Sequence, residues 1–333
     1  MQQRKTLFGA VYGAGFMGKT HLSGYKKLTD VTITGIIDPI VERAESVATQ
    51  YNVKSFSSIG EAVADHALDF IDICIPTPFH NTAVKEAFSH GCDVMVEKPI
   101  VSTLQDLEEI QDIMKNTTHR FMAAHVCRFI APYVYAKQTI NSGRLGKPTL
   151  FSGKRYSQMP GWSHNDWINN RKISGGTIID LSIHDVDIAN WFLGVPKRVF
   201  ATEVVWVDQG PAHVLETLEY EGNRAAHVEA SHLMPDGYGL DYEFYLVLEK
   251  GLISCRIGSE SQTIREMTEG VWKDIDIHDF VTYEEPYTEE VYHFTECLRS
   301  GKPFRVPFED AVTALKSVLL LQKSVEEKSA LPW

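Results

Sequence analysis

The sequence predicts an α/β fold in which a doubly wound parallel sheet is followed by an α+β domain with an open, mostly antiparallel sheet. Two observations lead to this prediction. Up to about residue 125, apolar strand-like runs alternate with helical patterns, which is typical of a parallel sheet with helices on both faces. Beyond residue 125 the pattern changes, and from Val199 to about Ile277 strand-like runs follow one another with little helix between them, which is typical of an antiparallel sheet.

The length and composition are those of an ordinary globular protein. Because 333 residues exceed what one core normally serves, we expect two domains, residues 1–125 and 126–333. The net charge of −12 disfavours nucleic acids and acidic membranes as partners. The five cysteines show no C-x-x-C spacing, and the N-terminus does not resemble a signal peptide. With no apolar run near the ~20 residues of a membrane span, we expect a reduced protein in the cytoplasm.

The first strand and helix enclose a glycine-rich turn. Leu7–Tyr12 predicts a buried strand, and Lys19–Leu28 places apolar side chains on one face of a helix. The turn between them has the pattern G-x-G-x-x-G, which is typical of a Rossmann fold with a dinucleotide pyrophosphate at the helix N-terminus. The first glycine allows the tight turn, the second admits the phosphates, and the third lets helix and strand pack closely. The predicted cofactor contacts here are Gly13, Gly15, Phe16, Met17 and Gly18.

The second strand, Val31–Ile37, ends in Asp38, twenty-five positions after Gly13. A carboxylate at this point can accept hydrogen bonds from both hydroxyls of the adenosine ribose, and it would repel a 2′-phosphate. We therefore expect NAD rather than NADP as the cofactor.

The remaining elements of the first domain continue the alternation. Helices are expected over residues 41–51, around 61–65, over 82–89 and from 103, where Thr103 and Asp106 resemble a capping box. Strands are expected over residues 70–75, 93–96 and 121–126. Because ligands bind at the carboxyl ends of parallel strands, the loops at 13–18, 76–80 and 97–99 should line the site.

The second domain begins with a predicted helix over residues 132–142 and a strand over 149–156. A polar loop over 158–176 precedes a long predicted helix from Thr177 to Leu193. Strand-like runs then fill residues 199–277, and the closing helices are expected over 288–299 and 308–327.

With Glu97-Lys98-Pro99 added to the glycine turn, the chain resembles the glucose–fructose oxidoreductase and inositol dehydrogenase group, the Gfo/Idh/MocA family. The resemblance covers nearly the whole chain. It rests on the glycine turn, Pro76-Thr77-Pro78-Phe79-His80-Asn81, the Glu-Lys-Pro tripeptide, and Ser174-Gly175-Gly176 followed by Asp180 and His184. It implies a Rossmann domain, an open mixed sheet, and a homodimer or homotetramer in which these sheets face one another.

The same resemblance implies cofactor contacts from Thr77, Pro78 and His80, although His80 could instead cap the following helix. It also implies that Glu97 positions the nicotinamide ribose and that Lys98 is the catalytic lysine. Chemistry supports the lysine independently, because a base must remove the hydroxyl proton while hydride passes to NAD. A lysine beside that hydroxyl stabilises the developing alkoxide. The simpler alternative is an exposed lysine after a strand. The Lys98–Pro99 bond is a candidate for the cis form.

Asp180 and His184 are four residues apart on the predicted helix, so their side chains should share one face. A carboxylate near an imidazole orients it and favours its protonated form. The resemblance implies that His184 is the general acid/base and that Asp180 orients it or binds a substrate hydroxyl. Alternatively, His184 packs on an apolar helix, or Asp180, His184 and Asp187 form a metal face. We expect no metal, because a metal would leave Lys98 unexplained.

The sequence also offers weaker candidates for substrate contact. Arg128 follows the last strand of the first domain and contacts substrate or forms a structural ion pair. Trp162 and Asn165 lie in the polar loop, where aromatic faces and amides suit a sugar. The two tryptophans of this loop, Trp162 and Trp167, could equally be packing anchors. Lys172 meets either substrate or solvent.

The sequence as a whole predicts an NAD-dependent dehydrogenase that oxidises a secondary hydroxyl of a sugar, inositol or related polyol. Lys98, Asp180 and His184 would carry the proton chemistry. One alternative is a glycosidase that keeps NAD bound and oxidises the sugar transiently, without net NADH. Another is a non-catalytic nucleotide-binding regulator, which need not retain these three residues.

Overall fold

The computed structural model describes residues 6–161, 164–206, 210–258 and 262–333. The chain divides into two compact units. The first comprises the residues up to Val126 together with Glu285–Phe308, and the second comprises Cys127–Glu284 and Glu309–Trp333. The division proposed from the sequence lies next to the Val126 limit, while Glu285–Phe308 returns to the first unit.

The first unit contains a six-stranded sheet in which every pair of neighbours is parallel. The order β3-β2-β1-β4-β5-β6 is that of a doubly wound Rossmann sheet, which confirms the predicted fold class. The sequence analysis did not identify β3, a three-residue edge strand with two exposed residues. The strands are β1 (Leu7–Tyr12), β2 (Val31–Ile37), β3 (Lys54–Phe56), β4 (Phe70–Ile73), β5 (Asp93–Glu97) and β6 (Phe121–Ala124).

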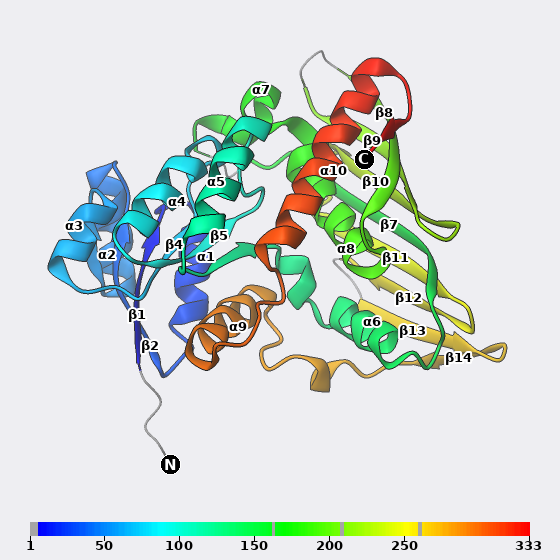
Figure 1. The fold of residues 1–333 in the computed structure, drawn as a ribbon, viewed down its shortest axis with the longest axis horizontal. Coiled ribbons are helices and arrows are strands. Elements are labelled where there is room, and N and C mark those ends of the chain that lie inside the picture. The colour runs from blue at the N-terminus through cyan, green and yellow to red at the C-terminus, as the bar shows by residue number, and fades with distance from the viewer. Residues whose placement is uncertain (1–5, 162–163, 207–209, 259–261) are drawn as a thin grey trace. The chain divides into compact units, whose positions relative to one another are not determined.

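Helices flank this sheet, and Figure 1 shows α4 and α5 in front of its strands. The predicted capping box opens α5, where the Thr103 hydroxyl accepts the Asp106 N–H at 3.1 Å. Helix α9 packs against α1, where a Cβ on Gly24 would lie 3.0 Å from Val291. The helices are α1 (Phe16–Tyr25), α2 (Val41–Tyr51), α3 (Ile59–Asp65), α4 (His80–Ser89), α5 (Leu104–Asn116) and α9 (Pro286–Ser300), with a 3₁₀ turn at Thr77–Phe79.

The second unit contains a nine-stranded open sheet in the order β14-β13-β12-β11-β7-β10-β9-β8-β15. Its neighbours are antiparallel except for β7 and β10, so the sheet is mixed, as expected. The strands are β7 (Pro148–Gln158), β8 (Pro196–Val205), β9 (Ala212–Tyr220), β10 (Arg224–Met234), β11 (Leu240–Leu248), β12 (Gly251–Ile257), β13 (Gln262–Thr268), β14 (Val271–Asp274) and β15 (Leu331–Pro332).

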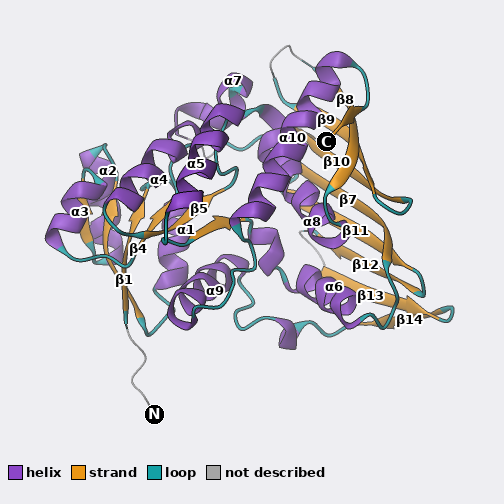
Figure 2. Cartoon of the chain, viewed as in Figure 1, coloured by secondary structure: helices purple, strands orange, loops and turns teal. Residues whose placement is uncertain are grey.

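Helices α8 and α10 cover one face of this sheet (Figure 2). The helices of the unit are α6 (Ala131–Ser142), α7 (Arg171–Ser174), α8 (Ile183–Leu193) and α10 (Phe308–Glu327), with 3₁₀ segments at Val126–Phe129, His164–Asn169 and His278–Phe280. None of the described helices combines the length and apolar character that crossing a membrane requires.

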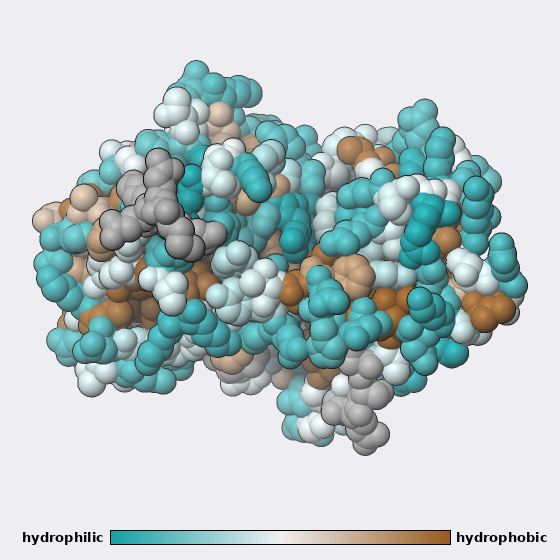
Figure 3. All heavy atoms as spheres, turned by 90° about the horizontal axis from the view of Figure 1, so that it is seen from below, coloured by the Kyte–Doolittle hydropathy of each residue, from teal (hydrophilic) through white to brown (hydrophobic). Residues whose placement is uncertain are grey.

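The opposite face of the large sheet carries apolar side chains that are partly open to solvent. Leu150, Phe200, Leu215 and Tyr245 are each 38–43% exposed, whereas the residue that follows each of them in its strand points to the opposite face and is buried. Apolar side chains also reach the surface among hydrophilic ones in the view of Figure 3. An exposed set of this kind on a sheet face is typical of a surface that binds a partner.

The long helix predicted from Thr177 to Leu193 is interrupted. Residues Ile178–Ser182 form a π-helix, and α8 begins only at Ile183. The preceding Gly175 and Gly176 have φ values of +79° and +73°, which explains the glycine pair. π-Helical turns often lie at functional sites, and this one contains Asp180.

Candidate active site

The glycine turn after β1 leaves space where a dinucleotide would approach. Gly13 has φ +118°, and a Cβ on it would lie 2.4 Å from the Cys74 carbonyl oxygen. A Cβ on Gly18 would lie 1.7 Å from the Gly13 oxygen, whereas a Cβ on Gly15 would meet nothing within 4 Å. Among the described residues, no side chain caps α1, and its first turn holds no acidic residue. These features fit the pyrophosphate of a dinucleotide against the amides of the helix.

Asp38 lies at the end of β2 and is almost fully buried. Its Oδ2 accepts the Ala14 N–H at 3.0 Å, and its Oδ1 accepts the Ile40 N–H at 2.9 Å. Arg43 approaches the same carboxylate, with Nη1 at 3.4 Å from Oδ2. Asp38 therefore joins the glycine turn to the end of the second strand, where an adenosine ribose would bind.

The loops after β4 and β5 are connected through His80. Its Nδ1 lies 3.0 Å from the Pro99 carbonyl oxygen, and its Nε2 lies 2.8 Å from the Ile75 carbonyl oxygen. Burial lowers the pKa of His80. The structure therefore gives His80 a bracing role between two loops, and Thr77 beside it is also buried. The Lys98–Pro99 peptide is cis, as the sequence suggested.

Lys98 follows β5 and is the one residue from Val94 to Ile100, all of them described, that is not buried. Its backbone N–H donates to Glu97 Oε2 at 3.0 Å. Burial by itself would raise the pKa of Glu97, but contact with His21 and the positive charge of Lys98 lower it below its ordinary value. Glu97 is thus held as a carboxylate directly beside the candidate catalytic lysine.

A buried polar cluster lies behind this carboxylate and was not predicted from the sequence. His21 on α1 contacts Asp72 on β4, with 2.8 Å between Nδ1 and Oδ2, and its Nε2 lies 3.3 Å from Glu97 Oε1. The Cys74 sulfur lies 3.4 Å from the same Nδ1. Glu290 on α9 is also buried, and burial raises its pKa well above the ordinary value. One available signal was Asp72, a charged residue inside an apolar strand.

In the second unit, Asp180 and His184 stand out by their exposure. From Thr177 to Asn190, a fully described segment, they are the two residues that are not buried. They lie on either side of the junction between the π-helix and α8. A regular helix is therefore not what places them, and the spacing argument made from the sequence does not apply unchanged.

Arg128 is buried in a network of ion pairs. Its Nε and Nη2 donate to Asp187 at 2.8 and 2.7 Å, and its Nη1 donates to Asp310 at 2.6 Å. These contacts favour the structural alternative for Arg128 over substrate binding. They also engage Asp187, which would have been the third ligand of a metal face with Asp180 and His184.

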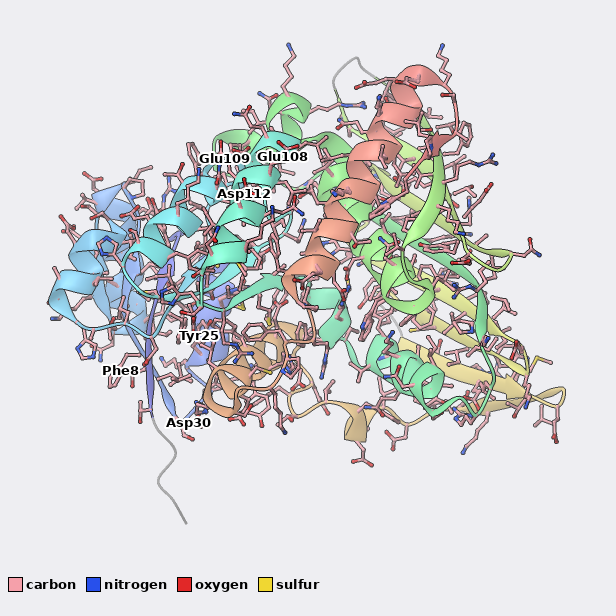
Figure 4. The ribbon with its side chains drawn as sticks, in the orientation of Figure 1. Phe8, Tyr25, Asp30, Glu108, Glu109 and Asp112 are labelled. Atoms are coloured by element: carbon pink, nitrogen blue, oxygen red, sulfur yellow. The ribbon has the colours of Figure 1, made fainter. Side chains whose placement is uncertain are left out.

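The remaining predicted substrate residues lie around the polar loop. Trp162 lies outside the described residues, and only the backbone of Asn165 is described, within a 3₁₀ segment. Lys172 is exposed on α7, and its N–H donates to the Asn170 side chain at 3.2 Å. In the first unit, Glu109 of α5, labelled in Figure 4, accepts hydrogen bonds from Asn81 and Lys85 and so links α5 to α4.

The parallel sheet, the glycine turn and the residues at the strand ends define an NAD-binding oxidoreductase. Residues 9–125 match the model of an oxidoreductase family with an NAD-binding Rossmann fold, and residues 133–254 match the GFO/IDH/MocA C-terminal domain. The chain belongs to the Gfo/Idh/MocA family of oxidoreductases.

Its relatives include inositol dehydrogenases. The chain is 30% identical to a scyllo-inositol 2-dehydrogenase (NAD(+)) of Bacillus subtilis, over 92% of this chain and 90% of the relative. It is 27% identical to an inositol 2-dehydrogenase of Rhizobium meliloti, over 95% and 96%. Its fold matches that of an Agrobacterium radiobacter oxidoreductase solved with NAD+, L-tartaric acid and magnesium, with a TM-score of 0.86, 20% identity and 98% of each chain covered.

Proposed function

We propose that this protein is an NAD-dependent dehydrogenase that oxidises a secondary hydroxyl of an inositol, a sugar or a related polyol. The observation that carries the proposal is Lys98, an accessible ammonium beside a buried carboxylate at the carboxyl end of β5. Ligands bind at this edge of a doubly wound sheet. The two inositol dehydrogenase relatives support the substrate class.

NAD, when bound, supplies the hydride acceptor. Lys98 stabilises the negative charge that develops on the substrate oxygen and relays the hydroxyl proton towards His184. His184 accepts that proton as the general base, and Asp180 orients the imidazole or binds a neighbouring hydroxyl. Glu97 holds the Lys98 peptide and contacts the nicotinamide ribose.

In this proposal, the protein also forms a homodimer or homotetramer through the open face of the large sheet. The partly exposed residues Leu150, Phe200, Leu215 and Tyr245 supply an apolar surface there. A polar group on β7, β9 and β10 accompanies it, because Glu229 accepts from the Tyr156 hydroxyl and lies 3.2 Å from His213 Nε2. A second copy of the sheet suits this mixture of apolar and polar side chains.

A panel of inositols, sugars and other polyols, assayed with NAD and NADP in parallel, tests the proposed function. We expect NADH to accumulate with a cyclic or linear polyol. Release of a sugar from a glycoside without net NADH would instead support the glycosidase, and binding of NAD without turnover on any substrate would support the regulator.

Two variants then test the proton relay. Lys98→Met and His184→Asn should each lower kcat by about 10²–10⁴-fold, the usual contribution of acid–base groups, while the Kd for NAD stays near that of the wild type. Lys115→Met, on the exposed side of α5, is the matched control and should keep full turnover. Near-normal turnover of both relay variants would rule out this mechanism.

A further inference from the structure

His21 lies at the centre of the buried cluster in the first unit, between two carboxylates that come from adjacent strands. Its Nδ1 is 2.8 Å from Asp72 Oδ2, and its Nε2 is 3.3 Å from Glu97 Oε1. Both ring nitrogens therefore face an acidic oxygen, and the ring has no exposed surface. The Nδ1 contact is a hydrogen bond, whereas the Nε2 contact is an ion-pair distance without hydrogen-bond geometry. An imidazolium between two carboxylates accounts for both contacts.

The surrounding groups agree with a positive charge on His21. Burial alone would lower the pKa of His21, but the negative charge and hydrogen bond of Asp72 raise it well above the ordinary value. Burial raises the pKa of Cys74, so the thiol stays protonated and donates to Asp72 Oδ1 at 3.5 Å. Tyr287 and Glu290 of α9 also interact with His21, and Tyr25 of α1, labelled in Figure 4, interacts with Asp72 and Cys74 of the same cluster.

Glu290 does not compete for this charge. Burial raises the pKa of Glu290 well above its ordinary value, which keeps the group neutral. In the described part of the chain, neither of its carboxyl oxygens has a hydrogen-bond partner. His21 and Lys98 are the cations that lower the pKa of Glu97, and His21 also contacts Asp72.

A metal ion is the other explanation for a buried His–Asp–Cys group, whose donor atoms lie within 4.8 Å of one another. The contacts oppose a metal ion, because Asp72 and Cys74 both lie against the same atom, His21 Nδ1, at 2.8 and 3.4 Å. A metal needs its ligands to converge on an empty centre, whereas this arrangement is filled by the imidazole proton.

We propose that His21 is a positioning residue, a buried imidazolium anchored by Asp72 that keeps Glu97 ionised and holds the Glu97 carboxylate against the backbone N–H of Lys98. This inference rests on the proposed function. The held peptide sets the direction in which the Lys98 side chain leaves the strand, and that direction matters because Lys98 is the proposed catalytic lysine. The contacts form a continuous chain from Asp72 through His21 and Glu97 to Lys98, with distances of 2.8, 3.3 and 3.0 Å. A displacement of about 1 Å at a catalytic group can cost 10²-fold in rate, so this chain matters for turnover.

The first test measures the charge of Glu97 by infrared spectroscopy of the full-length protein without substrate. Removing the cation in His21→Gln should raise the pKa of Glu97 by one unit or more, the size of effect that an adjacent charge has. A protonated-carboxyl band should appear at a higher pH than in the wild type as the pH is lowered, and it should be missing from His21→Gln/Glu97→Gln. His90→Gln, an exposed histidine of the same unit, is the control and should match the wild type. An unchanged Glu97 band in His21→Gln would overturn the proposal.

The second test is kinetic and uses the polyol found by the substrate panel. His21→Gln should lower kcat by about 10²-fold with little change in KM, and turnover should acquire a new rise with pH as Glu97 ionises. The double variant His21→Gln/Asp72→Asn removes one carboxylate with the cation and should recover part of kcat. Equal loss in the single and double variants, without a changed pH profile, would contradict a charge-based role.

The two tests separate this inference from the proposed function. The infrared result decides the His21–Glu97 link even if no polyol is oxidised, which would overturn the proposed function alone. If His21→Gln fails to fold, the double variant with Asp72→Asn, which buries two neutral amides, takes its place in the infrared measurement. One equivalent of metal that is bound by the wild type and lost from His21→Gln would overturn the imidazolium assignment.

Discussion

Glu216 offers a direct test of how burial sets charge in the second unit. It lies on β9, and only 1% of its surface is exposed. The Ser182 hydroxyl, at the end of the π-helix, donates to its Oε2, while its Oε1 has no hydrogen-bond partner in the described part of the chain. Burial raises the pKa of Glu216 to about 8, and nearby Asp185 contributes in the same direction. The folded protein therefore keeps Glu216 protonated at neutral pH.

The sign of the pH effect follows from the proton balance. The unfolded chain loses the Glu216 proton near pH 4.5, whereas the folded protein keeps it until about pH 8. Between these values the folded state binds more protons, so the free energy of unfolding falls by about 1.4 kcal/mol for each pH unit. From about pH 5.5 to about pH 7.5 this amounts to about 3 kcal/mol. Glu216→Gln is neutral in both states, keeps an oxygen for Ser182, and lacks this dependence.

Thermal unfolding followed by circular dichroism measures the difference. A loss of 1 kcal/mol lowers Tm by about 2–4 °C in a domain of this size, so Glu216→Gln should gain about 6–12 °C relative to the wild type over those two pH units. Glu219→Gln is the control, because Glu219 lies on the same strand but is exposed and paired with Arg198. An equal Tm difference between wild type and Glu216→Gln at both pH values would refute a neutral buried Glu216.

Three further predictions concern the cofactor site and the sheet face. Gly15→Ala should leave the Tm of the cofactor-free protein unchanged, because its Cβ meets nothing within 4 Å, but it should weaken NAD binding at least about tenfold in calorimetry. Asp38→Ser should lower the ratio of kcat/KM for NAD over NADP by about tenfold or more, since Arg43 could then meet a 2′-phosphate. Leu215→Glu should reduce the mass measured by light scattering to that of a monomer; an unchanged mass would mean that this face is not the interface.

The sequence predicted the first unit well where the signal is local. The bounds of β1 and β2 agree with the predicted runs, because a buried strand in a parallel sheet is a continuous apolar segment. The twenty residues of α10 were also predicted with the observed bounds. The edge strand β3 was missed, since three residues with little burial carry no such pattern.

Contacts between distant segments could not be predicted in the same way. His21 and Asp72 are 51 residues apart, and a polar residue inside an apolar run shows that a partner exists without showing which one. The π-helix at Ile178–Ser182 was read as regular helix, because its shift in hydrogen bonding leaves the composition of the segment unchanged. Arg128 was left between two roles, and its three carboxylate contacts, two of them fully buried, now favour the structural one.

The two units contain buried carboxyl groups in opposite charge states. Glu97 has His21 and Lys98 beside it, so its pKa lies below the ordinary value despite burial. Glu216 has a hydroxyl and a second acid nearby but no cation among the causes of its shift, so burial prevails and its pKa rises to about 8. Raising the pH therefore gives Glu216 a negative charge next to the π-helix that carries Asp180, whereas Glu97 is already ionised. Loss of stability on the alkaline side should then begin in the second unit, which is the behaviour that the Glu216→Gln comparison isolates.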